Sequence, residues 1–355
     1  MKKNSEYIVI ADALLTENGF VTDRAVRIKD GFITDITPPP QASRKVKVLD
    51  FSGHSMAPCF CDYHLHFFKR STEKINGITD DLTTSGISKV YEGGDAHGYG
   101  MEVKKAVTDR LAVETSGYAL CRKGSYGGYI GREVSTLQEA EYIIETLYQG
   151  GADYIKVVNS GVFEPDAGTI SSGRFTLHQL KHIVACAGAK GLDVACHANG
   201  DDAVRDAIEA GVSFIVHGLG VSSESLSLMA ERGVAFIPTV NAFACLASRK
   251  PEKMAHENIR KAVAQHLAAV KNACDVGVKV LPGSDAGAAL IPYGASFLRE
   301  LSLFEEAGTS IEKILLSAAA GTLERGAKAD FLILKDLTVK HVFRSGVLFT
   351  AQIKT

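Results

Sequence analysis

Short apolar runs alternate with helical segments over most of this chain, and this alternation limits the fold more than any other feature. From about Ser55 to about Ala320, runs of strand length are separated by segments whose apolar residues recur with the helical period. Alternation of strand and helix predicts a parallel sheet. About eight such units follow one another, which fits a closed (β/α)8 barrel, the TIM barrel, better than an open sheet.

The two ends of the chain have a different pattern. The first 50 or so residues alternate apolar and polar side chains, and hairpin turns are expected at Asn18-Gly19 and Asp30-Gly31. The last 25 or so residues repeat this alternation. We therefore expect both termini to form one small β-sandwich domain from residues 1–54 and 325–355, with the α/β barrel spanning residues 55–324.

Composition argues against several classes of function. The net charge is −2 and both signs are mixed along the chain, so neither nucleic acid nor a membrane surface is an expected partner. No apolar run is long enough to span a bilayer. The chain begins without an apolar signal segment, and its seven cysteines follow no disulfide spacing, which predicts a cytoplasmic protein with reduced thiols. The expected partner is a small-molecule substrate, and a homo-oligomer is left open.

Polar side chains interrupt the apolar strands at five places. They are His64 with His66, Lys156, His197, His217 and Asp285. Successive separations of 92, 41, 20 and 68 residues correspond to three, one, one and two units of about 20 to 45 residues. The side chains are therefore expected on the first, fourth, fifth, sixth and eighth strands, whose carboxyl ends surround the functional mouth of such a barrel.

This set of residue types indicates a metal centre. His64 and His66 are two residues apart on one strand, so both imidazoles lie on the same face and can reach one ion. Imidazole combined with carboxylate suits zinc or a similar divalent ion. Each residue alone has a structural explanation, since a strand-end histidine is usually hydrogen-bonded and a strand lysine usually lies at an edge. Their joint occurrence in this order favours the metal centre.

The order H-x-H, Lys, His, His, Asp resembles the amidohydrolase superfamily. The segment APCFCDYHLH is similar to the strand-one signature of its prolidase and imidazolonepropionase-like branch, and GADYIKVVNSG to the lysine segment of that branch. The likeness runs from about residue 50 to the end. It implies a binuclear centre in which His64, His66 and Asp285 hold one metal, His197 and His217 hold the second, and a carboxylated Lys156 bridges the two.

The resemblance also implies an activity. The chain is expected to hydrolyse an amide or other C–N bond of a dipeptide, an N-acyl amino acid or a cyclic amide. Two divalent ions, zinc in the first place and manganese, iron or cobalt as alternatives, would share the attacking hydroxide. Asp285 is the expected catalytic residue, which accepts the proton of the water and passes it to the leaving nitrogen.

Three alternatives stay open. A deaminase of a heterocycle would use one metal, lack the lysine and carry His-x-x-Glu on the fifth strand, where this chain has His197-Ala198-Asn199-Gly200. A lactonase or phosphotriesterase would use the same two-metal site. A barrel kept only as an interaction scaffold would be favoured by missing ligands, but all six are present.

Residues near the other strand ends are candidates for substrate binding. They are Tyr126, Tyr129, Ser160, Arg174, Asn199 and Asn241. Arg174 is the candidate for holding a substrate carboxylate with two hydrogen bonds, with a solvent-facing loop arginine as the alternative. The remaining histidines are expected to be structural or solvent-facing: His54, His97, His178, His182, His256, His266 and His341.

Overall fold

The computed structural model describes residues 6–40, 46–248, 253–288 and 291–349. The contacts divide the chain into two compact units. Unit 1 consists of Met1–Cys61, Asn76–Lys89 and Ser310–Thr355, and unit 2 of Asp62–Ile75 and Val90–Thr309. All six predicted metal ligands therefore belong to unit 2.

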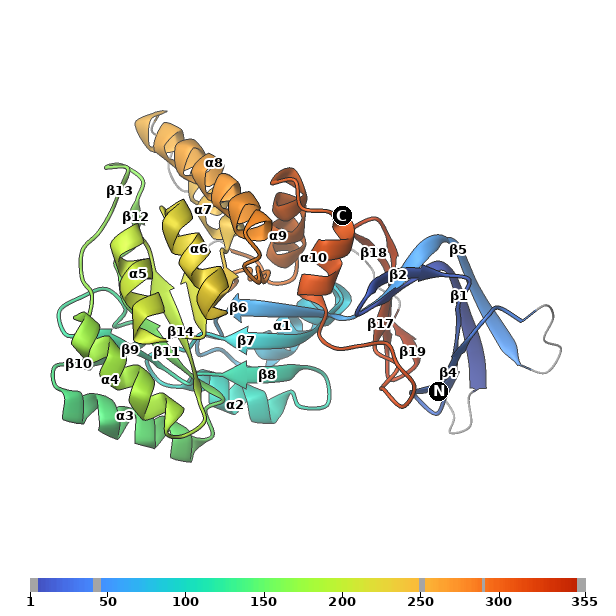
Figure 1. Ribbon diagram of the computed structural model, residues 1–355. Coiled ribbons are helices and arrows are strands. Elements are labelled where there is room, and N and C mark those ends of the chain that lie inside the picture. The colour runs from blue at the N-terminus through green and yellow to red at the C-terminus, as the bar shows by residue number, and fades with distance from the viewer. Residues whose placement is uncertain (1–5, 41–45, 249–252, 289–290, 350–355) are drawn as a thin grey trace. The chain divides into compact units, whose positions relative to one another are not determined.

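Both ends of the chain contribute strands to one eight-stranded sheet in unit 1 (Figure 1). The strand order is β19-β18-β17-β5-β1-β3-β4, and β2 pairs with β1. Strand β5 joins the two ends of the chain, because it is parallel to β1 and antiparallel to β17. The strands are β1 (Glu6–Thr16), β2 (Gly19–Thr22), β3 (Ala25–Lys29), β4 (Phe32–Thr37), β5 (Lys47–Pro58), β17 (Phe331–Lys335), β18 (Thr338–Arg344) and β19 (Val347–Phe349). The sandwich form of this domain stays a prediction.

One of the two predicted hairpin turns lies where the sequence places it. Asp30 and Gly31 connect β3 to β4 with positive φ angles of 52° and 87°, as an Asp-Gly hairpin turn requires. The other prediction is one residue out, because Thr16 pairs with Gly19 and the turn residues are Glu17 and Asn18. The Thr16 hydroxyl stabilises this turn by donating to the carbonyl oxygen of Gly19 at 2.8 Å.

The middle of the chain forms two further main sheets. A six-stranded sheet has the order β10-β9-β11-β14-β15-β16, and every pair in it is parallel. Its strands are β9 (Ala119–Arg122), β10 (Gly131–Val134), β11 (Tyr154–Val158), β14 (Asp193–Ala198), β15 (Phe214–His217) and β16 (Ala235–Ile237). A three-stranded sheet has the order β6 (Phe60–Leu65), β7 (Ile87–Glu92) and β8 (Ala112–Thr115). A short hairpin, β12 (Phe163–Glu164) and β13 (Thr169–Ile170), follows β11.

The six-stranded and three-stranded sheets are linked at two places. In the segment of residues 280–286, Val280 forms a parallel bridge with Phe236 of β16, and Ala286 forms one with Leu65 of β6. At the second place, the amide of Asp153, next to β11, donates to the carbonyl oxygen of Thr115 in the edge strand β8 at 2.9 Å. The two bridges are parallel, and the hydrogen bond of Asp153 makes a second connection between the sheets.

Six helices predicted from apolar periodicity are present: α3 (Leu137–Gly150), α4 (Leu177–Gly188), α5 (Asp201–Ala210), α6 (Ser223–Arg232), α8 (Lys253–Asp275) and α9 (Ala295–Glu306). A capping box formed by Thr176 and Gln179 starts α4. Gly211 and Gly233 end α5 and α6 in the left-handed conformation. Figure 1 shows α3 to α6 lying along the outside of the strands of unit 2.

Three helices went unrecognised in the sequence: α1 (Thr72–Thr84), α2 (Tyr99–Ala106) and α7 (Val240–Cys245). Helix α10 (Ile311–Ala318) precedes β17, as the sequence pattern indicates. The segment between Phe67 and Gly86, expected to be the first βα unit with an irregular loop, contains α1. Its asparagine, glycine and threonines are weak helix formers, which hides the helical period.

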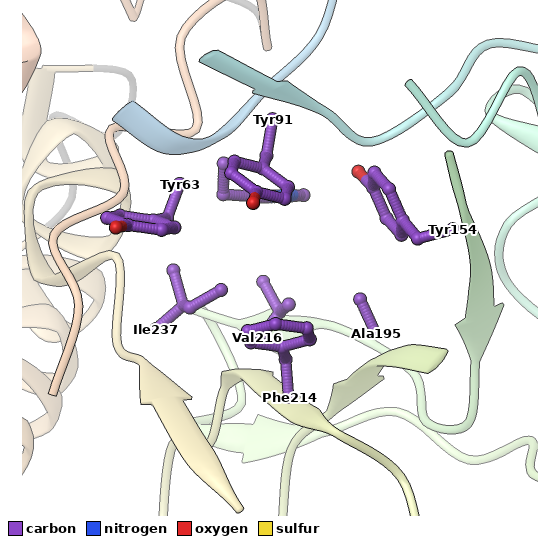
Figure 2. Close-up of a pocket in the computed structure, with 8 residues that line it drawn as sticks. Tyr63, Tyr91, Tyr154, Ala195, Phe214, Val216 and Ile237 are labelled. Carbon is purple, nitrogen blue, oxygen red and sulfur yellow. The ribbon is translucent and has the colours of Figure 1, made fainter. Parts of the chain in front are cut away.

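An apolar layer fills the space between the strands of unit 2. Figure 2 shows seven labelled side chains that face one small space, contributed by β6, β7, β11, β14, β15 and β16: Tyr63, Tyr91, Tyr154, Ala195, Phe214, Val216 and Ile237. The rings of Tyr63 and Tyr91 stack with centroids 5.3 Å apart. The space between the side chains is about 10 Å³, the size of one water molecule. The strands therefore surround packed side chains and not a channel.

Candidate active site

The six predicted metal ligands lie at the carboxyl ends of strands in unit 2, or directly after them. They are His64 in β6, His66 just after it, Lys156 in β11, His197 in β14, His217 at the end of β15, and Asp285 in the segment that bridges β16 and β6. Five of the six are buried, and the side chain of Asp285 is 16% exposed. The structure thus gathers these residues at one end of the strands.

Asp285 contacts both histidines of the H-x-H pair. Its Oδ1 atom is 3.3 Å from Nε2 of His64 and 3.5 Å from Nε2 of His66. The backbone amide of Asp285 also donates to the carbonyl oxygen of His64 at 2.7 Å. Ligand atoms of these three residues all lie within 4.8 Å of one another, so one ion can contact all three.

The four imidazoles form a continuous group. The ring centroids of His64 and His66 are 4.9 Å apart, those of His64 and His217 5.5 Å, and those of His217 and His197 4.6 Å. Histidines from three different strands therefore meet at one place. The second pair, His197 and His217, lies next to the first.

Hydrogen bonds orient three of the rings. Nδ1 of His66 lies 2.7 Å from the carbonyl oxygen of Gly94, and Nε2 of His197 lies 3.0 Å from that of Gly161. A carbonyl oxygen only accepts, so each imidazole donates to it and keeps its other nitrogen unprotonated when neutral. Nδ1 of His217 is hydrogen-bonded to the Thr239 hydroxyl at 2.6 Å. Partners of this kind are what fixes a metal-binding histidine in one orientation.

Burial keeps all four histidines neutral. Desolvation lowers the pKa of His64 and of His217 well below the usual value, and it lowers the pKa of His66 as well. The pKa of His197 falls to about 4, from desolvation first and the Lys156 charge second. A neutral imidazole has the free lone pair that a metal ligand needs.

Lys156 contributes a buried amine to the site. Its side chain is buried, and Nζ has no hydrogen-bond partner among the described residues. Burial lowers the pKa of the amine from 10.5 to about 8, while the charge of Asp285 acts in the opposite direction. A buried amine without a partner is destabilising on its own.

Comparison with known proteins agrees with this geometry. Residues 56–349 match the model of the Amidohydrolase family. The chain belongs to this family. An Aspergillus niger ochratoxinase is 26% identical over 418 residues, which cover 96% of this chain and 86% of that protein. The solved structure of a Xaa-Pro dipeptidase with bound methionine has a TM-score of 0.84 and 22% identity, covering 98% of this chain and 100% of that one. The A. niger ochratoxinase structure has a TM-score of 0.77 and 21% identity, covering 98% and 96%.

Membership of the family confirms the resemblance seen in the sequence. The protein is an amidohydrolase, a hydrolase that acts on carbon–nitrogen bonds. Amidohydrolases generally use a divalent metal and act on small molecules, and His64, His66 and Asp285 form a group that can hold such an ion. Within the described residues, no helix has the length and apolar character needed to cross a bilayer.

Asp62 supports the site of this amidohydrolase, although its role was missed in the sequence. Its Oδ1 accepts hydrogen bonds from the amides of His64 and Ser284, and its Oδ2 accepts one from the Ser284 hydroxyl at 2.5 Å. Asp62 thus ties the strand of His64 to the segment of Asp285. Burial raises the pKa of this carboxyl to about 7. Asp62 could have been found in the sequence, because it is a charged residue inside an apolar run, two residues before His64.

Glu92 is a second buried carboxyl near the site. Its oxygens accept hydrogen bonds from the Thr115 hydroxyl at 2.6 Å and the Gly94 amide at 2.8 Å. Burial raises the pKa of Glu92 to about 8. Because the carbonyl of Gly94 contacts His66, Glu92 holds the loop that orients this ring.

A pocket of about 810 Å³ opens onto the predicted ligands of the amidohydrolase. Asp285, His197 and His217 lie in its wall. Much of the remaining wall is aromatic or aliphatic: Phe68, Tyr126, Tyr129, Val162, Phe163, Pro165, Phe243, Leu246 and Ile291. A pocket of this size fits a small molecule with an apolar part.

The residues proposed for substrate binding separate into two groups. Tyr126, Tyr129 and Asn199 line the pocket, and the two tyrosine hydroxyls contact each other. Ser160 is buried behind Asn199 and accepts a hydrogen bond from its amide at 2.8 Å. Asn241, buried as well, donates its backbone amide to Glu300 at 2.7 Å.

Arg174 lies outside the residues that line the pocket. One of its guanidinium nitrogens is 3.2 Å from an Asp206 oxygen on α5, and its side chain is largely exposed. Arg70 is the arginine in the pocket wall. Its Nε is buried without a hydrogen-bond partner, and among the described residues it forms no ion pair. Nothing in the local sequence distinguishes the two arginines, because each simply follows a strand.

Proposed function

We propose that this amidohydrolase uses metal ions to hydrolyse an amide or related C–N bond of a small molecule. The observation that carries the proposal is the gathering of four neutral imidazoles, the Asp285 carboxylate and the unpartnered Lys156 amine at one end of the strands. A purely structural role leaves the amine unexplained, because burying it without a partner costs stability.

We further propose that the strands form a (β/α)8 barrel over residues 55–324, with a small β-sandwich domain from residues 1–54 and 325–355. Parallel pairing, the two bridges of residues 280–286 and the apolar layer of Figure 2 support the barrel. Within this proposed barrel range, residues 55–61, 76–89 and 310–324 belong to unit 1. The sandwich is supported by the sheet that both termini share.

Two divalent ions would be held by these side chains. His64, His66 and Asp285 would hold one ion, His197 and His217 the other, and a carboxylated Lys156 would contact both. Nitrogen and oxygen ligands of this kind suit zinc, with manganese, iron or cobalt as alternatives. When bound, such ions supply Lewis acidity toward the substrate carbonyl and a nucleophilic water near neutral pH.

Lys156 is suited to carboxylation. Burial lowers the pKa of its amine to about 8, so more of the amine is unprotonated near neutral pH than for an exposed lysine. The neutral nitrogen attacks carbon dioxide, a nitrogen–carbon bond forms, and one proton leaves the nitrogen. The product is a carbamate anion with two oxygens, which gives the buried side chain the charge and geometry of a bridging ligand.

Asp285 would move the proton during hydrolysis. Its carboxylate contacts His64 and His66 on one side and faces the pocket on the other. From this position it can accept the proton of the attacking water and deliver it to the leaving nitrogen. A carboxylate serves as the base in the first step, and its protonated form as the acid in the second.

The pocket favours an acylated amino acid or a dipeptide over a cyclic amide. Its apolar wall suits a hydrophobic side chain, and the Arg70 guanidinium can donate two hydrogen bonds to a carboxylate. The similarity to a Xaa-Pro dipeptidase supports a substrate of this class. Asn199, also in the wall, supplies a further polar contact.

The same residues bear on the two alternative activities, deamination and lactone hydrolysis. The buried Lys156 amine beside the imidazoles opposes a one-metal deaminase, which has no use for it. Hydrolysis of a lactone needs the same water and the same Asp285 carboxylate, so the ligands do not oppose it. A substrate panel that contains lactones as well as amides distinguishes the two.

We also propose a cytoplasmic location. None of the seven cysteines, all of which lie within the described residues, forms a disulfide. This state is typical of a reducing compartment.

The test combines metal analysis with a substrate screen. Protein produced with zinc and bicarbonate should contain about two ions per chain, and Lys156→Ala should lose one ion and most of the hydrolysis. The screen compares dipeptides, N-acyl amino acids, the corresponding carboxamides and lactones. A folded protein that is active without metal would refute the proposal, and full activity of Lys156→Ala would favour a mononuclear centre.

A further inference from the structure

A second group of metal-ligand side chains lies on helices α3 and α4, outside the pocket. Glu141 belongs to α3, and His182 and Cys186 lie one turn apart on α4. Residues four apart on a helix share one face, so the imidazole and the thiol of α4 both face Glu141. None of the three is among the predicted ligands of the active site.

The ligand atoms of this group converge. Nε2 of His182 is 2.8 Å from Oε1 of Glu141 and 3.6 Å from Sγ of Cys186. All three ligand atoms lie within 4.8 Å of one another. Tetrahedral ligands about 2.0 to 2.3 Å from zinc lie about 3.5 Å from each other, so small side-chain movements bring these atoms to zinc-binding positions.

We propose that Glu141, His182 and Cys186 form a zinc-binding site that joins α3 to α4. Nitrogen, sulfur and carboxylate oxygen together select a borderline ion such as Zn²⁺ over Mg²⁺ or Ca²⁺. Solvent supplies the fourth ligand, since the side chains of Glu141 and His182 are 53% and 27% exposed. On binding, the Cys186 thiol releases one proton to solvent and its thiolate contacts the ion.

The surroundings leave the site accessible. The nearby cation Lys190 is ion-paired with Glu145 and lies over the Tyr148 ring at 5.3 Å, so Glu141 is not neutralised by it. Burial and the Glu141 charge raise the pKa of Cys186.

Cobalt is the probe for this site, added to the metal-loaded enzyme after free metal has been removed. A thiolate bound to Co²⁺ gives a near-ultraviolet charge-transfer band, and none of the six active-site residues is a cysteine. We expect the band to saturate at one equivalent in the wild type and to be bleached by one equivalent of Zn²⁺. If the proposed hydrolytic function is wrong, this cobalt band is still expected, so the two proposals are tested separately.

Three variants and one control complete the test. Cys186→Ser should abolish the band, and His182→Ala and Glu141→Gln should weaken cobalt binding by at least about tenfold. Cys274→Ser is the matched control, because Cys274 is also a partly buried helical cysteine and its Sγ lies 3.7 Å from the Thr309 hydroxyl. The proposal is overturned if the wild type shows no band, if the band survives in Cys186→Ser, or if Cys274→Ser also loses it.

Discussion

Replacing Lys156 with methionine should stabilise the protein in the absence of metal. The pKa of the buried amine is about 8 in the folded protein against 10.5 for an ordinary lysine. At 1.36 kcal/mol per pKa unit this gap corresponds to about 3 kcal/mol. Methionine has a similar length and keeps the apolar stem in place, so the variant is expected to lose this cost without leaving a cavity.

The effect has a defined pH dependence. Because the folded state holds the proton of Lys156 less tightly than the unfolded chain, protonation favours unfolding. The cost is absent above the unfolded pKa of 10.5, grows as the pH falls toward 8, and is complete below 8. Lys156→Met should therefore be about 3 kcal/mol more stable than the wild type at neutral pH, and the two should converge at high pH.

Urea unfolding in the presence of a chelator, followed by circular dichroism at several pH values, measures this difference. With zinc and bicarbonate restored, the same variant should be inactive. Lys104→Met is the matched control, because the Lys104 amine lies 2.5 and 2.7 Å from the two Asp153 carboxylate oxygens and its loss should not stabilise the fold. A metal-free Lys156→Met protein no more stable than the wild type would contradict the reasoning, and retained activity would remove Lys156 from the site.

Three further changes test other parts of the site. Thr239→Val removes the hydroxyl next to His217 and should weaken binding of the second ion by about 10- to 100-fold in equilibrium dialysis, whereas Thr239→Ser should not. Arg70→Ala should raise KM about 10- to 100-fold for substrates with a carboxylate and leave carboxamides unaffected, while Arg174→Ala should change neither. Burial raises the pKa of Glu92 from 4.5 to about 8, so the free energy of unfolding of the wild type should fall as the pH rises through this range. Glu92→Gln should make the free energy of unfolding less dependent on pH. An unchanged slope in this variant would show that Glu92 is not the source of the pH dependence.

The predicted ligands could be found in the sequence because each interrupts an apolar strand. A buried strand tolerates few polar side chains, so His64, Lys156 and His197 stand out from their neighbours, and the unit length then places them on one end of the strands. Most of the helices were equally readable from their period and caps. The short helix α7 was not, because Glu300, 60 residues away, accepts hydrogen bonds from its first amides.

The partners that orient the site were not visible in the sequence. Gly94 and Gly161 act through backbone carbonyls, which every residue carries, and Thr239 belongs to the segment that follows the neighbouring strand. Which carbonyl or hydroxyl group contacts a given imidazole depends on how the neighbouring strands are placed. The same limit applies to Arg70 and Arg174, since local sequence fixes neither the direction of the side chain nor the presence of Asp206 beside one of them.

Backbone strain is a second indication of which residues serve function and not only stability. Seven non-glycine residues within the described ranges have positive φ. Four of them occupy tight turns between strands of unit 1: Asp23, Asp30, Asp336 and Ser345. The other three are His217 (φ 71°), Thr239 (φ 51°) and Asp285 (φ 54°).

Aspartate and histidine adopt this conformation more often than most residues with a side chain, but β-branched threonine is a genuine outlier there. Each such residue costs about 1 to 3 kcal/mol and persists only where its surroundings fix it. Here the bonds between His217 and Thr239 and between the Asp285 amide and His64 do so. A fold under selection for stability alone would place glycine at these strand ends; their side chains are therefore retained for what they contact, which is the centre proposed to hold the metal.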